Sequence, residues 1–309
     1  MNEFAFIDSL RSFATDPAAR GLLDDAAVLE IGAETLVLTH DMIAQGVHYL
    51  ADDPPADVAW KLVAVNLSDL AAKGASPLAA LLGFTLGEEA WDRAFAEGLG
   101  GALDAFGLPL VGGDTVALPA GAPRVLGLTA IGRAGSIVPS RAGARPGDRL
   151  WISGSLGDAG AGLRLRHERK DEPAALIERY RKPRPRLEAG QRLAALVSAM
   201  MDVSDGLLID ASRLASASGC RVSVRLDLLP LSPALLELNG DRLAAASAGD
   251  DYELLFAAAP ERTREIEALA EALGLPFSPI GTFGPGAGLH LLDGDTPVPL
   301  PERLGFEHG

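Results

Sequence analysis

The sequence predicts an α/β (α+β) fold divided into two domains. The chain has 309 residues, of which 48% are hydrophobic, so it carries enough apolar side chains for two cores. Helical and strand-like patterns are mixed in both halves, as in proteins whose helices pack on sheets. A loop-like run from Ser140 to Gly147 separates the halves. We therefore expect one domain over 1–140 and a second over 147–309.

The first domain is predicted to begin with a helix followed by paired strands. Apolar residues recur at helical spacing over 3–13. Two β-branched runs, at 28–31 and 35–39, are separated by a short turn and fit a hairpin, and the second run ends at Asp41. A charged carboxylate is therefore expected at the end of a strand.

The run 57–73 predicts a mostly apolar helix with one polar face. Asn66, Asp69 and Lys73 recur at three- and four-residue spacing and share that face. The other elements expected in this half are a strand at 78–86, a helix at 88–106, and strands at 108–111 and 125–131.

The second domain is predicted to alternate helices and strands as well. A strand at 149–153 follows the separating loop. The remaining elements expected are a helix from Asp158, helices that end near Ala199 and Ser218, a helix near 261–273, and strands at 221–226, 252–257 and 277–281. A turn at 202–206 joins two of these helices.

The charge balance excludes several classes of partner. Acidic residues number 42 and basic residues 27, for a net charge of −15, which argues against binding to nucleic acid or to an anionic membrane surface. No apolar run approaches the roughly 20 residues that span a bilayer, and no export signal is visible, so we expect a cytoplasmic protein. Because Cys220 is the only cysteine, any metal must be held by oxygen or histidine.

The placement of aspartates is the most informative feature of the chain. Several follow turns or strands and lie beside small residues, namely Asp24, Asp25, Asp41, Asp69, Asp114, Asp202 and Asp205. Grouped carboxylates repel one another unless cations neutralise them, and hard oxygen ligands suit Mg²⁺ shared with substrate phosphates. Taken singly, each of these residues is more often a structural turn or helix-cap residue than a ligand. As a set they favour a site for several Mg²⁺ ions and a nucleotide.

Other candidate residues keep two interpretations each. Gly112-Gly113-Asp114-Thr115 follows a predicted strand, where its backbone N–H groups could meet a phosphate, or it could form an ordinary turn. Ser204 could contact a nucleotide or cap the next helix. His48 and Arg141 could contact substrates or serve structure and solvation, and Asp250 could face a substrate or belong to a turn.

Six motifs in their order along the chain resemble the thiamine-monophosphate kinase family. They are Asp24-Asp25-Ala26-Ala27-Val28-Leu29, Thr39-His40-Asp41, the run 64–72 around Asn66-Leu67-Ser68-Asp69, Gly112-Gly113-Asp114-Thr115, Asp202-Val203-Ser204-Asp205-Gly206-Leu207 and Gly249-Asp250-Asp251-Tyr252-Glu253-Leu254. The resemblance implies an aminoimidazole-ribonucleotide synthetase-like architecture. It implies an N-terminal domain that binds ATP and Mg²⁺ and forms a dimer-spanning β-barrel with its twin, and a C-terminal α/β domain that completes the active site. It also implies transfer of the ATP γ-phosphoryl group to thiamine monophosphate by direct in-line attack.

The resemblance also implies roles for individual residues. The residues implied as Mg²⁺ ligands are Asp25, Thr39, His40, Asp41, Asp69, Asp114, Asp202 and Asp205, of which Asp69, Asp114 and Asp205 are expected to be catalytic. Gly113, Asp114, Arg141 and Ser204 are implied in nucleotide binding, and His48, Asp250 and Phe306 in thiamine phosphate binding. Three departures from the family pattern are Leu22-Leu23 before the Asp pair, His40 in place of Thr or Ser, and Asp250 in place of Glu.

Two alternatives remain from the sequence. One is another ATP-using enzyme of the same superfamily, although the lone Cys220 argues against members that need a cysteine near either end. The other is a non-enzymatic acidic module that binds Mg²⁺ or a nucleotide. ATP turnover that depends on a small acceptor distinguishes the kinase from such a module. The family resemblance also implies a homodimer.

Overall fold

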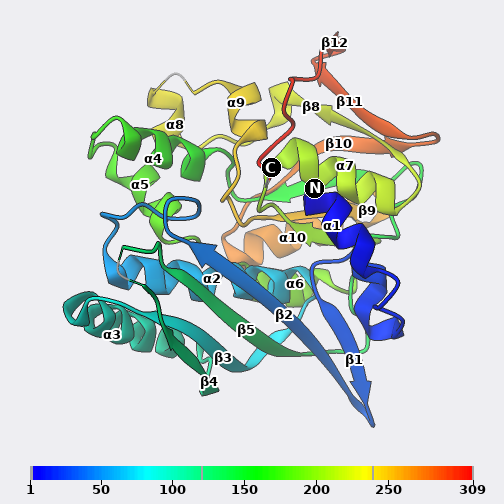
Figure 1. Ribbon diagram of the computed structural model, residues 1–309. Coiled ribbons are helices and arrows are strands. Elements are labelled where there is room, and N and C mark those ends of the chain that lie inside the picture. The colour runs from blue at the N-terminus through cyan, green and yellow to red at the C-terminus, as the bar shows by residue number, and fades with distance from the viewer. Residues whose placement is uncertain (1–2, 120, 239, 308–309) are drawn as a thin grey trace.

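The computed structural model describes residues 3–119, 121–238 and 240–307, which form two mixed sheets with helices packed on them (Figure 1). The sheet of the N-terminal half has the order β1-β2-β5-β3-β4. Its strands are β1 (Ala27–Ile31), β2 (Glu34–Ala44), β3 (Ser76–Leu86), β4 (Leu110–Ala117) and β5 (Val125–Ala134). All neighbours run antiparallel except β3 and β4, which are parallel and joined by a helix.

One face of this sheet is covered by α2 (Pro55–Ala72) and α3 (Glu89–Phe106) (Figure 1). Helix α3 buries a stripe formed by Phe95, Leu99 and Ala102, at the spacing of an amphipathic helix. Helix α2 is buried on most of its circumference, because the sheet packs on one side and the C-terminal half on the other. Its polar residues therefore lie inside the protein, between the two halves.

The sheet of the C-terminal half has seven strands in the order β12-β11-β8-β10-β6-β9-β7. They are β6 (Arg149–Ser153), β7 (Ala199–Asp202), β8 (Arg221–Arg225), β9 (Leu254–Ala258), β10 (Phe277–Gly284), β11 (Gly288–Asp293) and β12 (Thr296–Val298). Alternate residues of β6 and β9 enter different cores: Ile152 and Leu255 pack with α7, whereas Trp151 packs with α10. Helices thus cover both faces of this sheet.

The remaining helices surround this second sheet. They are α4 (Asp158–His167), α5 (Ala174–Arg181), α6 (Leu187–Leu193), α7 (Leu207–Ala217), α8 (Pro233–Glu237), α9 (Arg242–Ser247) and α10 (Thr263–Leu273), and α1 (Glu3–Leu10) precedes the first sheet. Helix α6 packs against α2 so closely that a Cβ atom on Gly190 would lie 1.9 Å from the carbonyl oxygen of Ala71. This glycine lets the two halves meet along the last turn of α2.

The strong patterns in the sequence are confirmed. The helices expected at 57–73 and 88–106 are α2 and α3, and the strand at 149–153 is β6. The first helix is shorter than expected and ends at Leu10. No described helix has the length and apolar character needed to cross a membrane.

Two expectations about strand boundaries and one about the end of a helix were wrong. The Gly112–Thr115 run is not a turn after a strand but the middle of β4, where the parallel backbone of β3 approaches so closely that a Cβ on Gly113 would lie 2.0 Å from the Leu82 carbonyl oxygen. Strand β2 continues past Asp41 to Ala44, because β5 pairs with it over its whole length. The helix expected to reach Ala199 ends at Leu193, and the strand β7 follows.

The five-stranded sheet is open within the described residues, with β1 and β4 at its edges. One chain therefore forms no closed barrel in this part of the molecule.

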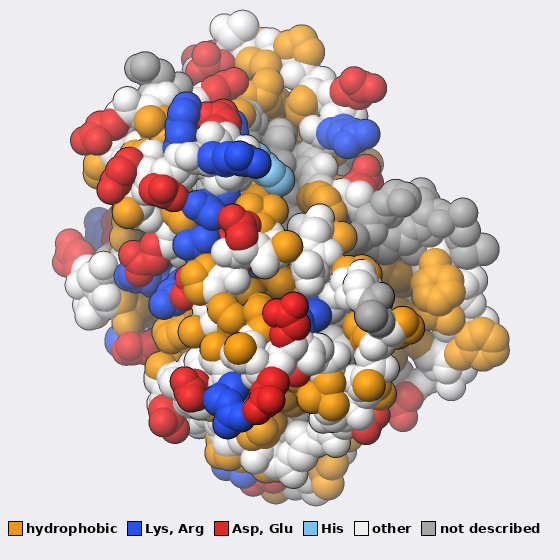
Figure 2. Space-filling model, turned by 60° about the vertical axis from the view of Figure 1, so that its left-hand side comes forward, with side chains coloured by type: hydrophobic (Ala, Val, Ile, Leu, Met, Phe, Trp, Pro, Cys, Tyr) orange, Lys and Arg blue, Asp and Glu red, His pale blue; other side chains and the backbone are white. Residues whose placement is uncertain are grey.

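The face shown in Figure 2 carries Lys and Arg side chains interspersed with Asp and Glu, and hydrophobic side chains exposed between them. The net negative charge consequently forms no continuous acidic patch on that face.

Candidate active site

A cleft of about 1520 Å³ lies between the two halves of the molecule. Its walls come from the segment before β1, from β2 and α2, and from the loops around 202–205 and 247–252. Helix α1 and the C-terminal segment 302–307 also line it. Of the residues expected in the site, those that line the cleft are Asp25, Asp41, His48, Asp69, Arg141, Asp202, Ser204, Asp205, Asp250 and Phe306.

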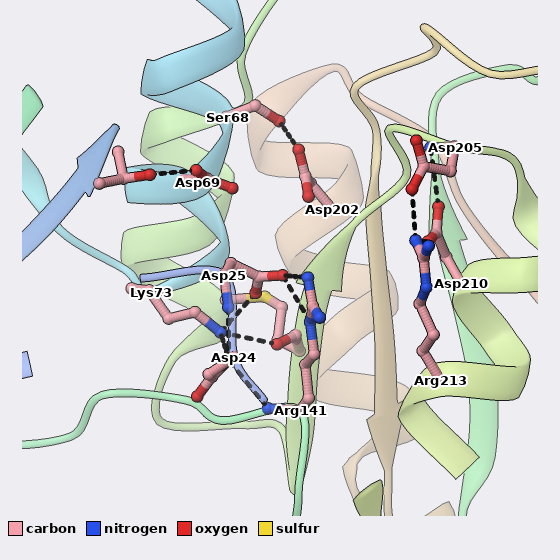
Figure 3. Close-up of polar contacts among 12 residues, drawn as sticks. Asp24, Asp25, Ser68, Asp69, Lys73, Arg141, Asp202, Asp205, Asp210 and Arg213 are labelled. Atoms are coloured by element: carbon pink, nitrogen blue, oxygen red, sulfur yellow. Dashed lines mark hydrogen bonds and ion pairs between the residues drawn. The ribbon is translucent and has the colours of Figure 1, made fainter. Parts of the chain in front are cut away.

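Three carboxylates converge at the inner end of this cleft. Asp25 precedes β1, Asp69 projects from α2, and Asp202 ends β7, and their carboxylate oxygens lie within 4.8 Å of one another (Figure 3). The Asp69 carboxylate accepts a hydrogen bond from the Thr39 hydroxyl, and Asp202 accepts one of 2.6 Å from the Ser68 hydroxyl. Neutral hydroxyls orient these carboxylates without neutralising them.

The pKa values show how unfavourable this crowding is. Burial, together with repulsion from Asp25, raises the pKa of Asp202 to about 8. Burial and repulsion from Asp205 and Asp25 raise the pKa of Asp41 to about 6. Burial and the neighbouring carboxylates also raise the pKa of Asp69 well above its usual value. Cations in the cleft would relieve this cost.

Lysine and arginine side chains form ion pairs with Asp24 and Asp25. Arg141 pairs with one oxygen of Asp25, donating from Nε at 2.6 Å, and Lys73 lies 2.5 Å from the other oxygen. Burial alone would raise the pKa of Asp24, but Lys73 and Arg20 hold it down to about 2. Arg20 pairs with Asp24 at 2.6 Å and also donates to the Pro139 carbonyl. This network fixes the segment before β1 to the end of α2 and to the segment 139–141.

A second charged group lies beside the first, at the start of α7 (Figure 3). The Asp210 carboxylate accepts hydrogen bonds from the backbone N–H groups of Asp205 and Gly206, and Arg213 pairs with both Asp205 and Asp210. Burial raises the pKa of Asp210 to about 7, against the effect of Arg213. Asp210 therefore provides hydrogen-bond acceptors for backbone N–H groups at the start of α7. The Ser204 side chain does not cap this helix.

His48 and Asp250 line another part of the cleft. Lys61 is buried and donates hydrogen bonds of 2.8 Å to the His48 carbonyl and to Asp250 Oδ2. The Tyr252 hydroxyl donates to Asp250 Oδ1 at 3.2 Å, so both oxygens of this carboxylate are held. His48 Nδ1 accepts a hydrogen bond from the Ala44 N–H, which leaves the ring hydrogen on Nε2. The left-handed φ of 70° at Asp250 marks a constrained loop.

Four expected site residues lie outside the cleft wall. Thr39 lies behind Asp69, to which it donates its hydroxyl hydrogen. The His40 side chain points to the other face of β2, where Nδ1 lies 2.9 Å from the Thr129 hydroxyl, so the imidazole does not reach the cluster. Gly113 and Asp114 lie in the exposed edge strand β4, three strands away from β2 in the sheet.

Two matching family descriptions cover most of the chain. "AIR synthase related protein, N-terminal domain" matches residues 23–134, and "AIR synthase related protein, C-terminal domain" matches residues 145–293. The thiamine-monophosphate kinase of Caulobacter vibrioides is 43% identical over 310 residues, which cover 95% of this chain and 86% of that protein. The chain belongs to the thiamine-monophosphate kinase family. The resemblance inferred from the six motifs is thereby confirmed.

Solved structures of this family agree with the fold. The thiamine-monophosphate kinase from Stenotrophomonas maltophilia K279a is 39% identical, covers 92% of this chain and 94% of its own, and gives a TM-score of 0.79. A second structure, described as "AaThiL complexed with AMPPCP and TMP", is 30% identical, covers 100% of this chain and 97% of its own, and gives a TM-score of 0.87. This member of the thiamine-monophosphate kinase family therefore has the two-domain aminoimidazole-ribonucleotide synthetase-like fold.

Several charged residues of the site were missed from the sequence. Lys73 was placed on the correct face of α2, but nothing in the sequence showed that it pairs with Asp24 and Asp25. Lys61 and Arg213 gave no signal, because the pairing partner of Lys61 is 189 residues away and Arg213 looks like an ordinary helical arginine. A buried position within an apolar helix run is the one clue that could have singled out Lys61.

Proposed function

We propose that this protein transfers the γ-phosphoryl group of ATP to the phosphate of thiamine monophosphate, giving ADP and thiamine diphosphate. The observation that carries the proposal is the convergence of Asp25, Asp41, Asp69 and Asp202 in one cleft of about 1520 Å³. That volume accommodates two phosphorylated substrates together. The relative complexed with AMPPCP and TMP supports the same pair of ligands. AMPPCP is an analogue of ATP in which a methylene group replaces the oxygen between the β- and γ-phosphorus atoms.

The donor set fits several Mg²⁺ ions. Carboxylate oxygens of Asp25, Asp69 and Asp202, from separate elements, lie within 4.8 Å of one another, and such oxygens are the ligands that Mg²⁺ prefers. We propose Asp25, Asp41, Asp69, Asp202 and Asp205 as ligands through their side chains. Thr39 supports Asp69, and His40 contributes at most its backbone carbonyl. When bound, Mg²⁺ would neutralise charge on the transferred phosphoryl group and on its neighbours.

The chain's own residues position the reactants. We propose that Arg141 and Ser204 contact the nucleotide, since both line the cleft beside the carboxylate cluster. His48, Asp250 and Phe306 would bind thiamine phosphate: His48 donates from Nε2, the Asp250 carboxylate faces the cationic ligand, and Phe306 offers an aromatic face. A terminal phosphate oxygen of the acceptor attacks the γ-phosphorus, and the bond to the β-phosphate oxygen of ADP breaks. Because that oxygen is already anionic, no residue is needed as a general base.

We also propose a homodimer, in which the exposed faces of two five-stranded sheets close a barrel. The sheet exposes large apolar side chains that a partner would cover, among them Met42, Val111 and Val116. The same arrangement accounts for Gly113 and Asp114, which lie on the edge strand β4 and outside the cleft of their own chain. We propose that they serve the site across the dimer, with the partner's Asp114 near Asp41.

The two domains are proposed to have different roles. We propose that residues 1–140 form the domain that binds ATP and Mg²⁺ and dimerises, and that residues 147–309 form the domain that completes the active site. The contact of Lys73 with the Met200 carbonyl, between α2 and β7, supports a fixed arrangement of the two domains around the cleft.

The test is chromatographic detection of thiamine diphosphate after incubation of the purified protein with ATP, Mg²⁺ and thiamine monophosphate. Free thiamine in place of the monophosphate serves as the acceptor control, and EDTA in place of Mg²⁺ as the metal control. We expect product only with the monophosphate and Mg²⁺. ATP binding without product would reject the proposal in favour of another acceptor.

A further inference from the structure

Lys73 is a fully buried cation at the edge of the carboxylate cluster. It follows the last residue of α2, and its side chain has no exposed area. Its ammonium group pairs with Asp24 Oδ1, lies 2.5 Å from Asp25 Oδ2 and donates to the Met200 carbonyl at 3.3 Å (Figure 3). It therefore links α2, the segment before β1 and the strand β7 at one point.

The position of Lys73 differs from that of the two arginines around the same carboxylates. The Arg20 and Arg141 side chains keep 21% and 22% of their area exposed, and Arg141 also lines the cleft. Arg141 can turn from Asp25 toward a ligand without crossing the protein core, whereas Lys73 has no such path. The Lys73 ammonium group is thus enclosed by the protein and lies beside the cluster without lining the cleft.

A buried lysine needs a physical reason, because removing an ammonium group from water costs several kcal/mol before its partners compensate. Asp24 has a second cationic partner, since Arg20 also pairs with it at 2.6 Å, although Lys73 does more to lower its pKa. The distinctive contact of Lys73 is the one with Asp25, whose carboxylate also belongs to the group formed with Asp69 and Asp202. Lys73 therefore lies where a divalent ion would otherwise compensate that group.

We propose that Lys73 is a built-in cation that takes over part of the charge compensation at Asp25, holding the cleft together before any divalent ion binds and weakening the affinity of the ion nearest Asp25. Lys73 is a positioning residue that acts through Asp25. The inference rests on the metal centre of the proposed function, and no substrate is needed to test it.

The test is the substitution Lys73→Met, which keeps the length and apolar stem of the side chain and removes its charge. Mn²⁺ binding is measured by electron paramagnetic resonance, and melting temperature with and without Mn²⁺. Because the cluster becomes more negative by one charge at close range, we expect Mn²⁺ to bind at least about tenfold more tightly. We expect the melting temperature to fall without Mn²⁺ and to recover when Mn²⁺ is added.

Two further variants isolate the charge. Lys61→Met makes the same change in a second buried lysine of α2, whose partner is Asp250, so it should lower the melting temperature without changing the response to Mn²⁺. The double variant Asp24→Asn/Lys73→Met restores the net charge and should bind Mn²⁺ within about threefold of the unchanged protein. Compared with Lys73→Met, it separates the effect of the lost charge from the effect of the lost ammonium contacts.

Two results would overturn the inference, and they differ from each other. If Lys73→Met binds Mn²⁺ like the unchanged protein and its melting temperature falls equally with and without the ion, Lys73 has a purely structural role. If the unchanged protein binds no Mn²⁺ that Asp69→Asn abolishes, the metal centre itself is wrong, and the inference fails with it.

Discussion

Asp69 is the residue on which the account of the site depends most. It projects from a buried helix into the carboxylate cluster, where burial and three other carboxylates raise its pKa. We expect Asp69→Asn to lower the turnover number at least about tenfold, because the amide cannot hold a cation between the phosphates as a carboxylate does. The melting temperature without metal should not fall, since the change removes repulsion. Thiamine diphosphate formation and circular dichroism measure the two effects.

Asp104→Asn is the matched control for this substitution. Asp104 is exposed on α3, away from the cleft, and the same chemical change there should leave the turnover number unchanged. A turnover number for Asp69→Asn close to that of the control would contradict the role assigned to Asp69.

The raised pKa values predict how the metal-free protein responds to pH. Asp41 and Asp202 have folded-state pKa values of about 6 and about 8, above the usual 3.8, so their protonated forms favour the fold. This stabilisation is complete below about pH 4 and is lost as the pH rises through about 6 and about 8. We therefore expect the melting temperature in EDTA to fall between about pH 5 and about pH 8, and Mg²⁺ to raise it most at the upper end.

Asp202→Asn supplies the comparison for the pH experiment. Because the amide does not titrate, the variant should show a flatter melting profile over the upper part of the range. The Asp24 carboxylate, with its pKa lowered to about 2, acts in the opposite direction but only below about pH 4. Equal slopes in the variant and the unchanged protein would contradict the assignment.

Single site residues were predictable where they belong to a sequence motif. They were not predictable where their role depends on an ion-pair partner distant in sequence. The aspartates of the cleft stand in short, ordered motifs, and the structure brings Asp25, Asp41, Asp69, Asp202 and Asp205 to one cleft. Lys61 and Lys73 were not assigned a role, because their function depends on carboxylates distant in sequence. His40 shows the reverse case, since strand alternation decides which way its side chain points.

At the scale of elements, the contact between α2 and α6 decides how the two halves meet. Gly190 of α6 lies against the backbone of Ala71, where an added Cβ would come within 1.9 Å of a carbonyl oxygen. We expect Gly190→Ala to lower the free energy of unfolding by about 2 kcal/mol or more, because α6 must move away from α2. Chemical denaturation followed by circular dichroism measures the loss.

Gly100→Ala provides the contrast within the same chain. Gly100 lies in α3, and a Cβ there would meet nothing within 4 Å. Alanine restricts the unfolded chain and suits a helix, so this variant should gain about 0.5 to 1 kcal/mol. A similar effect of both substitutions would show that the close packing of α6 on α2 is not the cause.

Elements were predictable in proportion to their length and periodicity. The long helices α2 and α3 and the strand β6 were predicted correctly. The four-residue strand β7 has no β-branched residue and depends on pairing with β9, so local sequence could not reveal it. The two glycines of β4 suggested a turn, although their small size instead allows close approach to β3.

At the scale of the whole molecule, the proposed homodimer depends on the exposed face of the open five-stranded sheet. Val111 is 63% exposed on the edge strand β4. If the proposed dimer forms, Val111→Asp converts it to a monomer, because a buried unpaired carboxylate would oppose association, and lowers the turnover number by separating Asp114 from the partner's site. Light scattering coupled to size-exclusion chromatography measures the mass.

Leu236→Asp is a comparable change elsewhere on the surface. Leu236 is 50% exposed on α8, in the other half of the chain, and its substitution should leave the mass unchanged. A monomeric unchanged protein with full activity would contradict both the dimer and the role of Asp114 across it.

The two-domain fold could be predicted from length, alternation and motifs, whereas the cleft could not. Its shape depends on contacts between distant segments, such as the Lys73 ammonium with the Met200 carbonyl and the Lys61 ammonium with Asp250. The family motif also assigned Asp114 to the site. The sequence could not show that, within a single chain, Asp114 lies on β4 and outside the cleft.

The most direct test of the account is to count ADP released against thiamine diphosphate formed in one reaction with ATP, Mg²⁺ and thiamine monophosphate. Direct transfer of the γ-phosphoryl group predicts one ADP per thiamine diphosphate and little ADP without the acceptor. ADP release that is independent of thiamine monophosphate, or thiamine diphosphate formed from free thiamine with release of AMP, would contradict it.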